Sequence, residues 1–265
     1  MKQTIYRTHR RLEGWPLVFT LLTVAAVLVG GLVEFLPFVL VKDSVPRIAS
    51  VTPFTPLEVA GRDLYIREGC VGCHSQMIRP FRAEIERYGD YTKPGETVYE
   101  HPFLWGSKRT GPDLQRIGGK YPHLWHVRHM ENPRSTSPAS IMPPYAWMLT
   151  DDLDFASIPA RLRALSRVGV PYSEAEITAA ADDAARQADA IAADVAAQGG
   201  PKTLNRKEII AMVAYLQRMG TDVKTAHTPR DPASNNDSAP RPPDSLATGT
   251  ARPAPTSPTP DGPRN

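Results

Sequence analysis

The apolar residues of this 265-residue chain gather most densely in one long run near its N-terminus. From Pro16 to Val33 no residue is charged, and beyond Glu34 the apolar run continues to Val41. This length exceeds the roughly 20 residues that a helix needs to cross about 30 Å of hydrocarbon. The pattern therefore predicts a transmembrane anchor over residues 16–41.

A cleavable signal peptide is the main alternative, because it also begins basic and turns apolar. Its apolar core spans only about 7 to 15 residues and ends in a small-x-small cleavage site. Here the run is longer and ends in FLPFVLVKDSVP, which favours an anchor that stays attached. Basic side chains within residues 1–15 predict a cytoplasmic N-terminus. Everything after Lys42 is then expected on the periplasmic side of a bacterial inner membrane.

Glu34 interrupts the anchor, and a carboxylate in lipid is costly unless it faces a partner or water. Its side chain either reaches the headgroups or marks a face on which another membrane subunit packs. Gly30 and Gly31 would let a second helix approach closely. The sequence leaves both interpretations open.

Beyond the anchor, the pattern predicts a connector over residues 42–56 and a folded domain over residues 57–223. Apolar residues recur at helical spacing near the start of this domain, in LEVAGRDLYIRE, and near its end, in RKEIIAMVAYLQRMG. Between these segments, residues 150–200 are predicted to be a helical insertion with a structural or docking role. Ser173 and Glu176 form a capping box within it.

The composition changes from about Lys224, where proline, serine and threonine dominate and large apolar residues nearly vanish. Such a segment cannot bury a core, so residues 224–265 are predicted to be a disordered tail. The whole chain is 41% apolar with a formal net charge of +3, which is too small to argue for a nucleic acid partner. The fold class predicted from these patterns is mainly α.

The two cysteines of the chain, Cys70 and Cys73, lie in EGCVGCHSQMIRP and are followed at once by His74. C-x-x-C spacings occur in thiol redox pairs, in zinc sites and, with the histidine, in attachment sites for c-type haem. A redox pair belongs among alternating strands and helices, and a structural zinc ion needs further soft ligands that no other cysteine supplies. Haem attachment accounts for all three of these residues, because the two cysteines form thioether bonds and the histidine is the proximal ligand. A reactive or structural thiol pair remains the alternative.

A c-type haem has two histidine ligands, a histidine and a methionine, or one open side, so the candidates for the second ligand are methionines and histidines. Met77 is too close to the attachment site to reach the opposite haem face. Met142 lies in NPRSTSPASIMPPYAWM, where Pro143 and Pro144 hold it in an extended loop that suits a thioether ligand. Met148 is the next candidate.

Three histidines, His123, His126 and His129, recur at spacings of three, which would place them near one face of a helix. That spacing could indicate a metal site. Without a nearby set of carboxylates or cysteines, packing or hydrogen bonding at the haem edge is the favoured interpretation.

These features resemble class I cytochromes c. In that family a short first helix leads into C-x-x-C-H and the last helix crosses it beside the haem, so Gly61 and Tyr215 are expected contacts, with packing elsewhere as the alternative. The family's T-G-P-x-L sequence lies against the proximal side. Its proline, here Pro112, accepts the Nδ1 proton of the haem histidine through its carbonyl.

Longer strings narrow the resemblance. QMIRPF, HPFLWGSKRTGPDL, NPRSTSPASIMPPY and AYLQRMGTD, with one N-terminal anchor, resemble the monohaem subunit (subunit II) of cbb3-type cytochrome c oxidases over residues 5–224. The resemblance implies a subunit that relays electrons to a catalytic subunit with b-type haems and copper, where oxygen is reduced to water. A dihaem cytochrome c subunit completes such complexes, and the oxygen-reducing site lies outside this chain.

The resemblance also implies roles for single residues. Cys70 and Cys73 would be the thioether donors of one covalent haem c, His74 its proximal ligand and Met142 its distal ligand. A calcium ion lies near the catalytic subunit in this family, which makes the loop around Ser107 a candidate contributor.

Four basic residues are candidates to face the haem propionates or the catalytic subunit, and solvated surface charge is the alternative for each. They are Arg79, Arg82, Lys108 and Arg109.

Three other functions remain open. The small cytochrome subunit of a nitric oxide reductase also has one anchor and one haem c. A free-standing, membrane-tethered electron carrier needs no partner enzyme, although Glu34 within the span argues mildly against it. A membrane-anchored thiol oxidoreductase would keep exchangeable thiols and carry no covalent haem.

Overall fold

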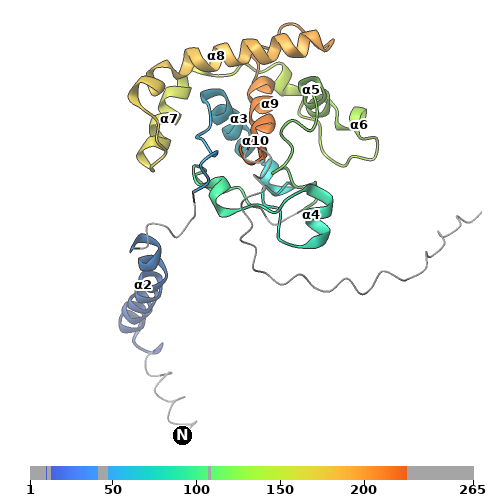
Figure 1. Ribbon diagram of the computed structural model, residues 1–265. Coiled ribbons are helices and arrows are strands. Elements are labelled where there is room, and N and C mark those ends of the chain that lie inside the picture. The colour runs from blue at the N-terminus through green and yellow to red at the C-terminus, as the bar shows by residue number, and fades with distance from the viewer. Residues whose placement is uncertain (1–9, 11–12, 41–46, 107–108, 226–265) are drawn as a thin grey trace, which may run out of the picture. The chain divides into compact units, whose positions relative to one another are not determined.

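The computed structural model describes residues 10, 13–40, 47–106 and 109–225, and its elements are helices joined by loops (Figure 1). Within this described part, β pairing is limited to an isolated antiparallel bridge between Asp152 and Lys207. The predicted fold class, mainly α, is therefore confirmed. Ser107, Lys108 and all but the first two residues of the predicted tail lie outside the described residues.

The apolar N-terminal run forms helix α2, Pro16–Leu40. Its stretch from Pro16 to Pro37 is long and apolar enough to cross a membrane, and none of it is buried against other parts of the protein. Helix α2 is thus compatible with a single membrane anchor. Glu34 is exposed on it, which leaves both interpretations of that carboxyl group open.

Two helices from opposite ends of the domain, α3 (Pro56–Arg67) and α9 (Glu208–Arg218), cross at very short range. A Cβ atom on Gly61 would lie 1.9 Å from the backbone oxygen of Ala211, so only glycine allows this approach. The rings of Tyr65 and Tyr215 pack 5.5 Å apart at the same crossing. The predicted contact between the first and last helices of the domain, with Gly61 and Tyr215 in it, is therefore present.

The predicted insertion is part of the core. It forms α7 (Ile158–Arg167) and α8 (Glu174–Ala197), and α8 packs on α3, α9 and α5 (Figure 1). Ser173 begins α8 through the expected capping box with Glu176. Small side chains let α8 lie close to its neighbours, and the buried residues along this face are Ile177, Ala180, Ala184, Ala188, Ala192 and Val195.

Shorter elements connect these helices. Helix α5, His123–Glu131, packs on α9 and is followed by α6, Pro133–Thr136. The remaining elements are η1 (Cys70–Gly72), α4 (Arg82–Tyr88), η2 (Pro94–Thr97), η3 (Ala146–Leu149), η4 (Phe155–Ser157) and α10 (Thr221–Thr225).

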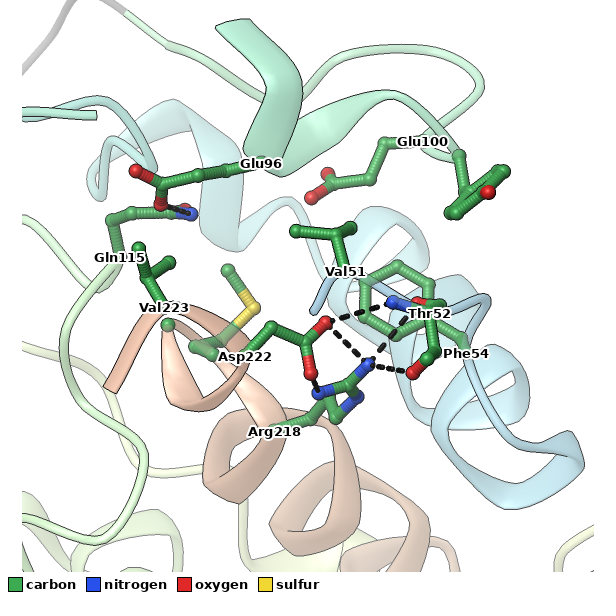
Figure 2. A pocket seen from close by; sticks show the side chains of 12 residues that line it. Val51, Thr52, Phe54, Glu96, Glu100, Gln115, Arg218, Asp222 and Val223 are labelled. Atoms are coloured by element: carbon green, nitrogen blue, oxygen red, sulfur yellow. Dashed lines mark hydrogen bonds and ion pairs between the residues drawn. The ribbon is translucent and has the colours of Figure 1, made fainter. Parts of the chain in front are cut away.

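A polar cavity of about 30 Å³ lies between the segment around Thr52, the turn after η2 and the start of α10 (Figure 2). Glu96 lines it and is neutralised by Arg116, whose two terminal nitrogens lie 2.6 and 2.8 Å from the Glu96 carboxylate. Glu100 lines it too and is only 5% exposed. Burial raises the pKa of Glu100 to about 7, because Arg62 offsets only part of the desolvation. The folded protein therefore binds a proton here more tightly than the unfolded chain does.

This raised pKa predicts a pH-dependent stability. Below pH 4.5 Glu100 is protonated in both states, and between pH 4.5 and 7 only the folded state keeps the proton, so folding becomes less favourable as the pH rises. Glu100→Gln should remove this loss, which we expect to be roughly 3 kcal/mol across that window. Urea unfolding of the full chain in detergent at several pH values measures it.

Glu86→Gln, the same change on the exposed face of α4, is the control. An equal pH dependence in wild type and Glu100→Gln would show that the Glu100 carboxyl is not the group responsible.

Candidate functional site

The C-x-x-C-H motif lies in one tight turn directly after α3. Gly69 has a φ of 72°, a left-handed conformation that suits glycine, and it turns the chain from the end of α3 into η1. The backbone nitrogens of Cys73 and His74 both donate to the Cys70 oxygen, at 3.1 and 2.9 Å. The turn therefore brings two thiols and an imidazole together within five residues.

The two thiols are free, with Cys70 buried and Cys73 exposed. Burial raises the pKa of the Cys70 thiol to about 12, and the nearby Glu68 carboxylate adds to the shift. Redox-active thiols need a lowered pKa, because the thiolate is the nucleophile. Cys70 is therefore a poor nucleophile in the folded protein, and its environment is compatible with a thiol whose role is to form a bond once.

His74 is oriented by the loop that follows η2. Its Nδ1 lies 2.8 Å from the backbone oxygen of Pro112, and because a carbonyl can only accept, Nδ1 carries the hydrogen. Nε2 is then the nitrogen with a free lone pair. Burial lowers the pKa of His74, so the ring is held in its neutral form, which is the form that binds metals. The expected hydrogen bond between His74 and Pro112 is thus present in the structure.

Two glycines let the same loop lie directly on the motif. A Cβ atom on Gly111 would lie 2.4 Å from Cε1 of His74. Gly106 has a φ of 40°, and its Cβ would lie 3.0 Å from the oxygen of Val71 and 3.1 Å from that of His74. The Gly111 nitrogen also donates to the Cys73 oxygen at 2.9 Å. No pattern in the sequence marks these two glycines, although Gly111 is the glycine of T-G-P.

Asp113 fastens this loop to the residues after His74. Its carboxylate accepts from the Ser75 hydroxyl at 2.6 Å and from the backbone nitrogens of Met77 and Gln115 at 3.0 and 2.9 Å. The Asp113 side chain is fully buried, so these donors replace its lost hydration. Sequence reasoning missed Asp113, because an aspartate beside a proline resembles an ordinary turn residue.

The candidate arginines share one carboxylate. Arg79 donates through Nε to Glu84 at 2.6 Å, and Arg109 pairs with Glu84 at 2.8 Å. Arg109 also donates to the Met77 oxygen at 2.8 Å. These two side chains therefore have protein partners next to the motif, and their contact with haem propionates stays a prediction. Arg82 is exposed and pairs with Glu86.

The candidate methionines differ in burial. Met142 is half-buried, lies in the loop after α6 and packs against the core. Met148, the second candidate, is fully buried on η3 and belongs to the core itself. The assignment of Met142 as the distal ligand, with Met148 as the next candidate, stays a prediction.

The histidines of α5 have three separate environments. His123 lies 2.5 Å from a carboxylate oxygen of Asp194, His126 is buried, and His129 lies 2.6 Å from the Thr136 hydroxyl. In the described part of the chain, no three histidine, cysteine, aspartate or glutamate side chains gather as a metal site.

Comparison with known protein families bears on whether the C-x-x-C-H motif is a haem site or a thiol pair. The family described as cytochrome c oxidase, mono-heme subunit/FixO matches residues 9–223, from seven residues before α2 into α10. The chain belongs to the FixO family. A search among curated proteins found no match.

As a FixO protein, the chain is a mono-haem subunit of a cytochrome c oxidase, and it therefore requires a site for one haem. The geometry fits this group. His74 presents Nε2 with no partner among the described residues, the two free thiols lie beside it, and Gly111 leaves the ring the space that a side chain would fill. Ser107, the calcium candidate, lies outside the described residues.

The close approach of Gly111 generates a prediction for this FixO chain. Gly111→Ala should displace the His74 ring or push Pro112 away from it, at a cost of about 1–3 kcal/mol. We expect the haem to be retained, with its visible spectrum changing at a lower temperature than in wild type. Gly72→Ala is the matched control, because a Cβ there meets no atom within 4 Å. Equal thermal behaviour of the two variants would contradict the prediction.

Proposed function

We propose that this chain is the membrane-anchored cytochrome c subunit of a cbb3-type oxidase and relays electrons to a catalytic subunit with b-type haems and copper. One observation carries the proposal: in a FixO family chain, the imidazole after C-x-x-C donates its Nδ1 proton to the Pro112 carbonyl and keeps Nε2 available. That arrangement suits a permanent iron ligand, because the neutral ring directs an unshared Nε2 lone pair away from Pro112.

Each residue that would hold the haem has a separate role. Cys70 and Cys73 would form the two thioether bonds, so that the group is not lost between turnovers. His74 and Met142 would be the two protein ligands of the iron. The haem supplies a reversible one-electron change at iron. Pro112 accepts the Nδ1 proton, which fixes the orientation of the imidazole and increases its basicity as a ligand.

The proposed location follows from α2. Its length and composition suit a single span, and the basic residues before it favour a cytoplasmic N-terminus and a periplasmic haem domain. There the domain can receive electrons from a dihaem cytochrome c subunit and pass them to the catalytic subunit. Oxygen is reduced in that catalytic subunit.

The small subunit of a nitric oxide reductase is the second candidate, because it shares the anchor and the haem c. The FixO match favours the oxidase. A tethered carrier without a partner is disfavoured by the same match, since the family is defined as an oxidase subunit.

Purification in mild detergent tests the proposal. We expect the full chain to retain a partner with b-type haems and copper, and the complex to consume oxygen when reduced. Non-haem iron in place of copper would indicate a nitric oxide reductase.

The cysteine variants test haem attachment. Cys70→Ala and Cys73→Ala should each abolish the haem-stained band of this chain on a denaturing gel, because both thioethers are needed for stable attachment. A normal stained band in either variant would remove the haem assignment.

The distal ligand has its own test. Met142→His should keep the haem low-spin, lower its reduction potential and remove the weak near-infrared band of a sulfur–iron bond, because methionine ligation raises the potential. Met148→Leu is the control and should keep the band. The reverse result, with the band lost in Met148→Leu and kept in Met142→His, would assign the ligand to Met148.

A further inference from the structure

Three aromatic rings on α5 and just before it stack in one column. Tyr121 and Trp125 stack with ring centroids 3.9 Å apart, and Trp125 and His129 stack 4.6 Å apart with an interplanar angle of 10°. The four-residue spacing places these side chains above one another on one helix face. The stack fixes the plane of the His129 ring.

The fixed ring holds the next segment of the chain. Nδ1 of His129 lies 2.6 Å from Oγ1 of Thr136, the last residue of α6. The Thr136 hydroxyl can donate to the Pro133 oxygen, 3.2 Å away, while Oγ1 accepts from His129 in the tautomer that carries its hydrogen on Nδ1. The bond joins α5 to the chain six residues before Met142.

Helix α5 also holds the far end of this loop. The backbone nitrogen of Tyr145 donates to the Met130 oxygen at 2.7 Å. Between the two attachments, the Ser137 nitrogen donates to the Pro133 oxygen of α6 at 2.9 Å. The other described hydrogen bonds are internal to the loop: the Ser140 nitrogen donates to the Ser137 oxygen, and the Met142 nitrogen donates to the Ser140 hydroxyl. Both ends of the Met142 loop are thus attached to consecutive residues of one helix.

We propose that His129 is a positioning residue for the distal ligand: by bonding to Thr136 it holds the loop so that the Met142 thioether remains at the iron. This inference rests on the proposed function, in which Met142 is that ligand. A thioether is a weak, uncharged ligand, so the loop's own preference decides how much of the time it is bound. Removing one attachment lets the loop move away without disturbing the proximal side.

Two substitutions remove the same bond from opposite sides. His129→Phe keeps a ring for stacking on Trp125 and removes the Nδ1 donor, and Thr136→Val keeps the side-chain shape and removes the acceptor. In the full chain, each should keep wild-type amounts of covalent haem. The fraction of Met142 released from iron should rise roughly fivefold to tenfold, as expected for one hydrogen bond.

The readouts are the sulfur–iron near-infrared band, followed with increasing pH and urea, and the reduction potential. We expect the band to be lost at lower pH and lower urea in both variants, and the potential to fall. The double variant should release Met142 no more than either single variant does, because both substitutions remove the same hydrogen bond. Thr136→Ser, which keeps the hydroxyl, should restore wild-type behaviour.

His123→Phe is the matched control, because the same substitution on the same helix removes a bond to Asp194 on α8 instead. In His123→Phe the near-infrared band should be lost at the same pH and the same urea concentration as in wild type. Wild-type behaviour of both His129→Phe and Thr136→Val, or an equal shift in His123→Phe, would overturn the inference. Failure of the proposed function looks different: the band would then be absent from wild type or would survive Met142→His.

Discussion

The 2.8 Å hydrogen bond between His74 and the Pro112 carbonyl joins segments that are 38 residues apart, and the proposed haem site depends on it. The turn after α3 can present an imidazole, but it cannot by itself choose the ring's orientation or its tautomer. The loop that carries Pro112 does both, and it reaches the ring because Gly111 has no side chain. A backbone carbonyl is a suitable partner, because it cannot change its protonation state as the iron changes its charge.

The charged groups around this loop form a connected network. Glu84 binds both Arg79 and Arg109, while Arg109 also lies 3.4 Å from the buried Asp113 carboxylate. Removing one member of a buried charged group leaves the others without compensation, which costs more than the pair contributes when intact. The network therefore ties the segment after the motif, helix α4 and the Pro112 loop into one unit.

Much of this site follows from local sequence. The spacing of Cys70, Cys73 and His74 specifies its own chemistry. The helical periodicity around Gly61 and Tyr215 predicts the helices α3 and α9, and the resemblance to class I cytochromes c implies that they cross. These signals are readable because each depends on residues close together in the chain or on a strong apolar pattern. The resemblance to class I cytochromes c supplied the partner of His74.

Other features depend on contacts that no local pattern encodes. Arg79 and Arg109 both pair with Glu84, which no local pattern indicates, and their contact with a cofactor or a partner protein stays a prediction. Asp113 gives no signal of burial, because aspartate is common in turns. The position of His129 within a stack, rather than in a metal site, depends on how α5 sits against the chain that follows it.

The alanine-lined face of α8 changes how the insertion should be regarded. An insertion that stands apart from its host can be cut out and the gap closed. Here Ala180, Ala184 and Ala188 are fully buried along a face that packs on α3 and α9, so the host domain has no finished surface beneath it. Excising α7 and α8 would leave the two helices that frame the C-x-x-C-H turn open to water. The segment is therefore one layer of the folded domain. A shorter protein with the same arrangement of α3 and α9 would have to cover these helices with other residues.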